Sequence, residues 1–225
     1  MRLQDLNWMD VENYLKQDNR IILITGSTEQ HAYLSLMTDV LIPQHIADAA
    51  ARRANVLVAP PLNFGISFIF RDFPGTISIS REAFDLVLFD MVESLAHQGF
   101  RRFYICNGHG GNALPERVKT FRKSDGVQVF WYDWWRSPAA KAYAQSHGLQ
   151  ILHANWGENF PFNRVADSPT GEKTPVNMGD IQTPKAARQA LGDGSFGGMY
   201  QVNQAVMQGL FETVVDEFTE LVERS

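Results

Sequence analysis

The stretch Gly26–Asp39, GSTEQHAYLSLMTD, follows the short apolar run Ile21–Ile24. A short β-branched run that stops at a glycine is typical of a buried strand. The stretch after it carries the carboxylates Glu29 and Asp39 and the imidazole His31. Residues two apart in an extended segment point to the same side, so Glu29 and His31 would face one ligand together. Mixed nitrogen and oxygen ligands suit divalent zinc, manganese or iron, and the alternative is a polar loop with one solvated histidine.

The overall composition is that of a globular protein. The chain has 225 residues, of which 44% are hydrophobic and 20% charged, and this fits one α/β domain over residues 1–225. The net charge of -5, without a cluster of Lys or Arg, argues against a nucleic-acid footprint or an anionic membrane surface as partner. The single cysteine, Cys106, excludes an intrachain disulfide and a CxxC zinc site. The sequence has neither an apolar core of signal-peptide length nor the ~20 apolar residues of a membrane span, so we expect a cytoplasmic protein.

Short apolar runs alternate along the chain with stretches of helical periodicity. Strands are expected at Ile21–Ile24, Val56–Val58, Thr76–Ser80, Phe103–Cys106 and Val127–Tyr132, and helices at 5–18, Val40–Ala54, Arg81–His97, Glu116–Lys123, Pro138–His147 and Tyr200–Val222. This alternation predicts a mostly parallel sheet with helices on both faces, in which ligands bind beyond the carboxyl ends of the strands. Pro43 is expected in the first turn of its helix, and 61–75 and 161–184 are expected to be long loops.

A second chemical element, Asn107–Asn112 with the sequence NGHGGN, follows the fourth expected strand. Its glycines let the backbone approach a ligand closely. A glycine-rich turn between strand and helix could cradle a phosphate, but this one lacks the Lys-Ser/Thr ending of a P-loop. A histidine at a tight strand end indicates a metal ligand, which makes His109 a candidate. The alternative is an ordinary turn with an exposed histidine.

The third element is His153–Glu158, HANWGE. In a helix, five residues subtend about 140° beyond a full turn, so His153 and Glu158 need not share a face. One could then be a ligand and the other a proton shuttle, or Glu158 could simply be a carboxylate favoured at a helix start. Four tryptophans could wall a pocket for a flat ligand or fill the core, namely Trp131, Trp134, Trp135 and Trp156.

Together these stretches resemble the creatininase (creatinine amidohydrolase) family. The matching residues occur in the family's order and are Glu29-Gln30-His31 with Leu36 and Asp39, then Phe73-Pro74-Gly75-Thr76, then Asn107–Asn112, then His153-Ala154 with Glu158. The resemblance implies a three-layer α/β/α sandwich with a mostly parallel central sheet, two divalent metal ions per chain (zinc, manganese or iron), and often a hexameric homo-oligomer. It implies that the metal ligands are Glu29, His31, Asp39, His109 and Glu158, with Asp39 bridging the two ions. It also implies proton transfer by His153.

Two departures from the family pattern concern the substrate. Family members often continue HAG with a Glu-Thr-Ser triplet, whereas here Asn155 replaces the glycine and Asn159-Phe160 follow Glu158. Many members carry a Glu-His pair shortly before FPGT, where this chain has the apolar, Arg-containing stretch Phe68–Asp72. The departures leave the implied ligands untouched and argue against creatinine itself as the substrate.

The expected activity is hydrolysis of a non-peptide C–N bond in a small cyclic amide, by a water whose pKa two metal ions lower. The backbone N–H groups of Gly110 and Gly111 would hold the developing oxyanion, and His153 would protonate the leaving nitrogen. Trp156 and Arg71 are the other candidate substrate-binding residues. Two alternatives are a deformylase or amidase that acts on a linear or peptide-like amide, and a non-catalytic binding protein with the same fold.

Overall fold

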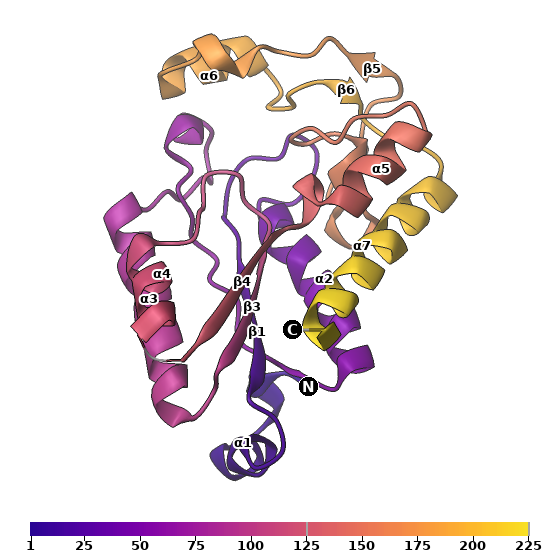
Figure 1. Cartoon of the computed structure of the whole chain (residues 1–225). Coiled ribbons are helices and arrows are strands. Elements are labelled where there is room, and N and C mark those ends of the chain that lie inside the picture. Colours follow the sequence, from indigo (N-terminus) through magenta and orange to yellow (C-terminus); the bar gives the residue numbers. More distant parts are fainter. Residues whose placement is uncertain (125, 225) are drawn as a thin grey trace.

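The structure, a computed structural model, describes residues 1–124 and 126–224, so that Ser225, the end of the expected domain, lies outside the described residues. A four-stranded parallel sheet forms its centre (Figure 1). In spatial order the strands are β2 (Leu57–Val58), β1 (Arg20–Thr25), β3 (Arg102–Asn107) and β4 (Gln128–Asp133). Ile21 of β1 lies opposite Leu57 on one side and Phe103 on the other. The expected parallel sheet is confirmed.

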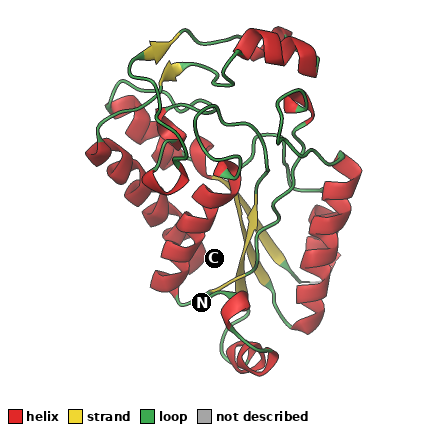
Figure 2. Cartoon of the chain, turned by 180° about the vertical axis from the view of Figure 1, so that it is seen from behind, coloured by secondary structure: helices red, strands yellow, loops and turns green. Residues whose placement is uncertain are grey.

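Helices cover both faces of this sheet (Figures 1 and 2). On one face lie α3 (Arg81–Gln98) and α4 (Glu116–Ser124), and on the other lie α2 (Thr38–Ala54), α5 (Pro138–Ser146) and α7 (Gln204–Arg224). The side chains of β1 divide between the two faces because they alternate along the strand. Ile22 and Ile24 pack with α2 and α7, whereas Ile21 and Leu23 pack with α3. The three-layer α/β/α arrangement is therefore confirmed, and none of the described helices is both long and apolar enough to cross a membrane.

Several expected elements differ from the structure. The strand expected at Thr76–Ser80 was wrong, since this segment makes only two isolated β-bridges to neighbouring loops. The helix expected at 5–18 is shorter, α1 (Trp8–Leu15), because Asn7 and Asp10 form a capping box at its start. The short 3-10 helices of the described chain are Leu3–Asp5, Phe68–Phe70, Trp134–Arg136, Trp156–Glu158, Pro161–Asn163 and Met178–Asp180.

Helix α2 begins earlier than expected, at Thr38, and this moves Pro43 from the first turn into the helix interior. Proline has no N–H, so Pro43 cannot donate to the carbonyl of Asp39, and its ring crowds that carbonyl. The Asp39 carbonyl lies against two glycines instead. A Cβ atom at Gly26 or Gly108 would come within 2.4 Å or 2.0 Å of it. The first turn of α2 is thus held between the ends of β1 and β3.

A small cap, residues 172–199, lies beyond the carboxyl ends of the strands, at the top of Figure 1. It contains α6 (Pro184–Leu191) and an antiparallel pair of short strands, β5 (Glu172–Lys173) and β6 (Gly198–Met199). The segment 161–184, expected to be loops, therefore includes β5 and the start of α6. The cap covers the edge of the sheet at which a parallel α/β fold binds its ligands.

Candidate metal centre

Five side chains meet beyond the ends of β1 and β3. Glu29 and His31 come from the segment after β1, Asp39 from the first turn of α2, His109 from the turn after β3, and Glu158 from a short 3-10 helix. All five are buried. Three of them are acids, and buried carboxylates require compensating positive charge nearby. The structure thus brings together the complete set of ligands that the sequence predicts.

Asp39 lies between the two histidines. Its Oδ1 is 2.9 Å from Nε2 of His31, and its Oδ2 is 2.8 Å from Nδ1 of His109. Glu158 Oε2 lies 3.7 Å from the same nitrogen of His31, and Glu29 Oε2 lies 3.4 Å from the same nitrogen of His109. The side chains form two groups that share Asp39, and within each group the possible ligand atoms lie within 4.8 Å of one another.

Each of these histidines uses its other ring nitrogen on a backbone carbonyl. Nδ1 of His31 is 3.1 Å from the carbonyl oxygen of Glu29, and Nε2 of His109 is 3.0 Å from that of Ile66. A carbonyl only accepts hydrogen bonds, so these nitrogens carry the protons. In a neutral ring the other nitrogen then presents a lone pair. Both lone pairs face carboxylate oxygens, which is the arrangement that a cation between them stabilises.

The charges of the site favour a cation in the same place. Burial lowers the pKa of His31, but the carboxylates of Asp39, Glu158 and Glu29 outweigh it and raise the pKa to about 10. Burial also raises the pKa of Glu158, to about 7, and outweighs the lowering by His31. For Asp39, the two histidines outweigh burial and hold the pKa below its usual range.

Two buried atoms in the site have no hydrogen-bond partner among the described residues, and one belongs to each group. They are Nε2 of His31 and Oε2 of Glu29. Unpaired buried polar atoms are rare in folded proteins, and each requires a physical reason. A metal ion in each group would complete both. Two imidazoles and three carboxylates could therefore hold two divalent ions that share Asp39.

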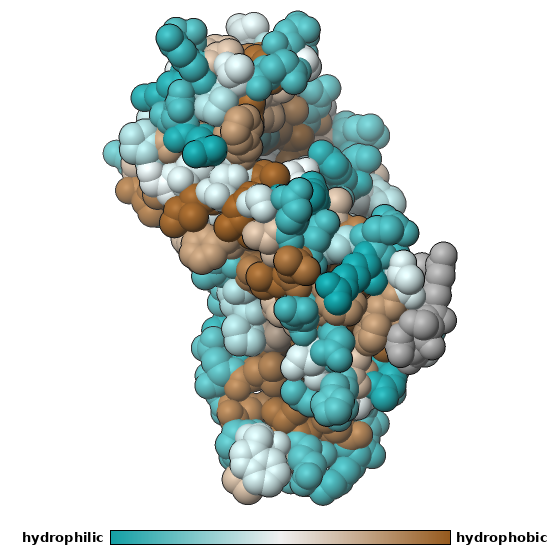
Figure 3. Space-filling model, turned by 90° about the vertical axis from the view of Figure 1, so that its left-hand side faces the viewer, coloured by the Kyte–Doolittle hydropathy of each residue, from teal (hydrophilic) through white to brown (hydrophobic). Residues whose placement is uncertain are grey.

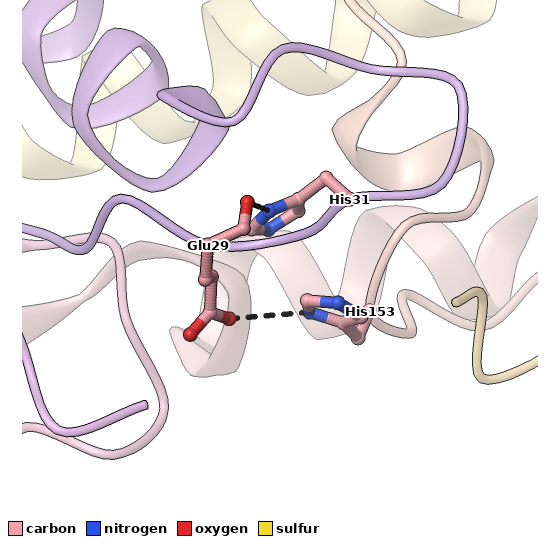
Figure 4. Close-up of side chains that lie close together, drawn as sticks. All are labelled: Glu29, His31 and His153. Atoms are coloured by element: carbon pink, nitrogen blue, oxygen red, sulfur yellow. Dashed lines mark hydrogen bonds and ion pairs between the residues drawn. The ribbon is translucent and has the colours of Figure 1, made fainter. Parts of the chain in front are cut away.

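His153 lies beside Glu29 and His31 (Figure 4). Its Nδ1 is 3.8 Å from Glu29 Oε1. Its Nε2 is 3.0 Å from the backbone oxygen of Gln30 and 2.8 Å from the side-chain amide nitrogen of the same residue. The ring stacks on Phe70 and packs against Phe196 at centroid distances of 4.9 Å and 4.8 Å. Burial and the nearby histidines lower the pKa of His153 well below its usual value. Gln30 therefore fixes Nε2, and Nδ1 is the nitrogen that a substrate can reach.

A pocket of about 650 Å³ opens above these residues. Its described lining includes the predicted Gly110 and Gly111, whose backbone N–H groups donate to no described residue. Of the four tryptophans, Trp135 lines the pocket within the described chain. The other lining residues include Ile69 and Phe70, which belong to the stretch Phe68–Asp72 that departs from the family pattern. No sequence motif singles out the further lining residues Arg136, Lys141, Ile151, Leu152 and Phe196.

Two predicted substrate-binding residues are not among the described residues that line the pocket. Trp156 is fully buried in the core, where its Nε1 donates to the carbonyl of Gln150 at 2.8 Å. Arg71 is exposed and lies 5.6 Å above the ring of Phe68. The side chains of the loop 61–75 point in different directions, since Ile69 and Phe70 line the pocket while Phe68 faces solvent.

Figure 3 shows one side of the molecular surface, on which hydrophobic residues form patches below the top of the molecule.

The cap reaches the centre through its loop 192–197. The carbonyl of Gly194 accepts from the Gln30 amide at 3.0 Å, and Phe196 packs on His153. Lys173 ties this loop down, since its ammonium donates to the carbonyls of Leu191 and Ser195 and to the carboxylate of Asp193 at 2.5–2.7 Å. The cap therefore contributes both to the pocket wall and to the position of His153.

Replacing Lys173 with Met is expected to loosen the cap and leave the sheet intact. The three acceptors lose their donor, which should lower the local stability of the cap by about 1–3 kcal/mol. Hydrogen exchange should become several-fold faster at the amides of 190–198, with exchange in β1 and β3 unchanged. Lys185→Met, an exposed lysine of α6, is the matched control. Equal exchange in the two variants would show that Lys173 does not hold the cap.

Known proteins resemble this chain in sequence and in fold. The family model "Creatininase: Creatinine amidohydrolase" matches residues 4–222. A creatinine amidohydrolase from Pseudomonas putida is 28% identical over an alignment of 257 positions, which covers 95% of this chain and 96% of that protein. A mycofactocin precursor peptide peptidase from Mycobacterium ulcerans (strain Agy99) is 37% identical over 123 residues, covering 49% of this chain and 48% of that protein. A solved manganese creatininase superposes with a TM-score of 0.79 at 21% identity, covering 99% of this chain and 97% of that one, and so shares the fold.

Proposed function

The chain belongs to the creatininase family, and from this membership we propose that it is a metal-dependent amidohydrolase that cleaves a non-peptide C–N bond. Two divalent ions would be held by Glu29, His31, Asp39, His109 and Glu158. The observation that carries the proposal is the pair of groups that share Asp39, each with a buried atom that lacks a partner. Zinc, manganese and iron all suit this donor set.

Two divalent ions bound there would lower the pKa of a water molecule and would polarise a substrate carbonyl. The residues of the chain supply the remaining parts. The N–H groups of Gly110 and Gly111 are free to hold the oxygen that becomes negative as water adds to the carbonyl carbon. His153, fixed at Nε2, offers Nδ1 to return the proton taken from water to the leaving nitrogen. The C–N bond then breaks to give a carboxylic acid and an amine.

The relatives support the reaction class and leave the substrate open. One is named for creatinine and another for a precursor peptide, and both names denote hydrolysis of a C–N bond. A solved structure with the same fold is a manganese form. The expected cyclic-amide substrate, the cytoplasmic location and the homo-oligomer stay predictions.

Metal analysis combined with an amide screen tests the proposal. Purified protein is expected to carry about two equivalents of zinc, manganese or iron per chain, and to hydrolyse one or more members of a panel of cyclic and linear amides. Chelation should abolish turnover and lower the Tm, since the binding free energy of the ions is lost from the folded state. A protein that takes up none of the three metals after incubation with each would overturn the proposal.

Replacing His109 with Ala should lower the metal content to about one equivalent and abolish turnover, because one of the two groups loses its only imidazole. His147→Ala is the control, since His147 is exposed at the end of α5. Unchanged metal content and turnover in the His109 variant would show that the assignment of this ligand is wrong.

A further inference from the structure

The pocket above the metal centre is larger than a creatinine-sized ring requires. Its volume of about 650 Å³ lies within the range of pockets that enclose drug-sized ligands, roughly 300–1,000 Å³. A ring of a few atoms held at the centre would leave most of this space to water. The volume therefore indicates a substrate that extends beyond the bond to be cleaved.

Two cations that form no hydrogen bond or ion pair with the described residues line this space. Arg136 ends the 3-10 helix Trp134–Arg136, and Lys141 lies near the start of α5. Neither side chain makes a hydrogen bond or an ion pair with a residue that the structure describes. The carboxylates of the described lining are Glu29, Asp39 and Glu158, and all three belong to the metal centre. Within the described lining, no acidic residue outside the metal centre neutralises these two positive charges.

Arg136 lies close to the reacting end of the pocket. A Cβ atom at Gly110 would be 3.9 Å from Nη2 of Arg136 and from the ring of Trp135, and Gly110 follows the candidate ligand His109 directly. The guanidinium lies 5.3 Å from the ring centre of Trp135. Stacking of this kind restrains the guanidinium and leaves its N–H groups available. A planar fork of free N–H donors matches a carboxylate in a bidentate pair.

A different part of the lining is apolar. Ile69 and Phe70 come from the loop 61–75, Ile151 and Leu152 from the segment before His153, and Phe196 from the cap. Phe70 and Phe196 also contact the ring of His153. An apolar group of the substrate would pack against these side chains while the amide lies over the metal centre.

We propose that the substrate is a linear amide with a free carboxylate bound by Arg136 and Lys141 and an apolar group bound by the Phe70–Phe196 side of the pocket. The inference rests on the proposed function and adds the substrate class to it. It selects the linear amide over the small cyclic amide, because the two cations and the apolar wall require two arms on the substrate.

Binding of a non-hydrolysable pair of probes tests the carboxylate site without relying on turnover. Phenylbutyrate and the matched neutral alcohol, phenylbutanol, are titrated calorimetrically into manganese-loaded protein. We expect the carboxylate to bind about tenfold more tightly than the alcohol, because one charge-assisted hydrogen bond strengthens binding by about this factor. The preference should fall several-fold in Arg136→Gln or Lys141→Gln and disappear in the double variant. Arg136→Lys should keep part of it, because the charge stays while the fork is lost.

Arg53→Gln is the matched control, since it removes one exposed guanidinium about 20 Å along α2 from Asp39 and should keep the full preference. If the double variant keeps the preference, the carboxylate binds elsewhere, the metal ions included, and the inference is wrong. Equal affinity of the two probes for the wild-type protein would also overturn it.

Hydrolysis of N-benzoyl-β-alanine and of its neutral N-methyl amide separates this inference from the proposed function. A higher kcat/KM for the charged amide than for the neutral one, with this difference lost in Arg136→Gln, supports both the inference and the proposed function. Turnover of the two amides with equal kcat/KM overturns the inference and leaves the hydrolase standing. Carboxylate-selective binding without hydrolysis of any amide in the panel counts against the hydrolase and leaves the carboxylate site supported.

Discussion

Asp39→Asn is expected to lose both metal ions together and to lower amide hydrolysis by more than about a hundredfold. Each oxygen of Asp39 faces one histidine, at 2.9 Å and 2.8 Å, so the substitution removes a shared charge from both groups at once. The new amide also places an N–H donor where one group needs an acceptor. Mutation of residues that only support metal ligands already costs 10–100-fold in metal affinity or activity, and loss of the shared ligand should cost more. Elemental analysis after dialysis and the amide assay measure the two effects.

The control for this experiment lies on the same helix. Asp48 is also buried in α2, but it accepts hydrogen bonds from Arg2 and not from the histidines of the centre. Asp48→Asn should lower stability to some degree and leave the metal content at the wild-type value. Retention of both ions by Asp39→Asn would show that Asp39 does not bridge them. Loss of one ion alone would place Asp39 in a single group.

Gly108→Ala is expected to destabilise the fold by about 3 kcal/mol or more, which is at the upper end of the cost of overpacking. The new Cβ would lie 2.0 Å from the carbonyl oxygen of Asp39 and 2.8 Å from Cγ of Pro43. Both neighbours belong to the rigid start of α2, so neither can move aside cheaply. Urea unfolding monitored by tryptophan fluorescence measures the free energy of unfolding.

Gly110→Ala is the control from the same turn, since a Cβ there would meet nothing closer than 3.9 Å. Its stability should stay within about 1 kcal/mol of the wild type, which is the normal range for a glycine replaced without a clash. If the two variants unfold at the same urea concentration, the contact between the turn and α2 is not tight. A destabilised Gly108→Ala that also binds less metal would show that this contact places the Asp39 carboxylate.

The parallel sheet and the candidate ligands could be predicted from the sequence because both are encoded locally. The strand Ile21–Ile24 is short, β-branched and closed by a glycine, and Glu29 and His109 each follow a strand end within a few residues. In a parallel sheet those ends meet at one edge, so the topology itself brings Glu29 and His109 together. The family resemblance added Asp39 as the shared residue.

The errors came where contacts distant in sequence decide. Thr76–Ser80 alternates as a strand does, but no neighbouring strand is available to it, and alternation alone does not form a sheet. The side chain of Trp156 turns into the core while the same short helix carries Glu158 into the site. Local sequence could not distinguish these two directions for residues two positions apart.

The two cations of the pocket wall could not be predicted, for a related reason. Arg136 and Lys141 are ordinary charged residues in sequence, and only the packing of α5 shows that they have no acidic partner among the described residues. The cap is held by Lys173, whose three acceptors lie 18 to 22 residues away, so no periodic pattern marks it. Gln30 lies inside the predicted motif, but its bonds to His153 and Gly194 cross most of the chain.

The order of the cap along the chain has a consequence for how such enzymes diverge. All candidate ligands and His153 precede Asn159, whereas the cap loop that reaches them follows it, and α7 packs against α2 only afterwards. Recombination between relatives with crossovers between Asn159 and Gln204 would exchange one wall of the pocket in a single event. The candidate ion-binding residues and the helix that closes the core would pass unchanged into the hybrid, so new substrate preferences can arise in this family without rebuilding its chemistry.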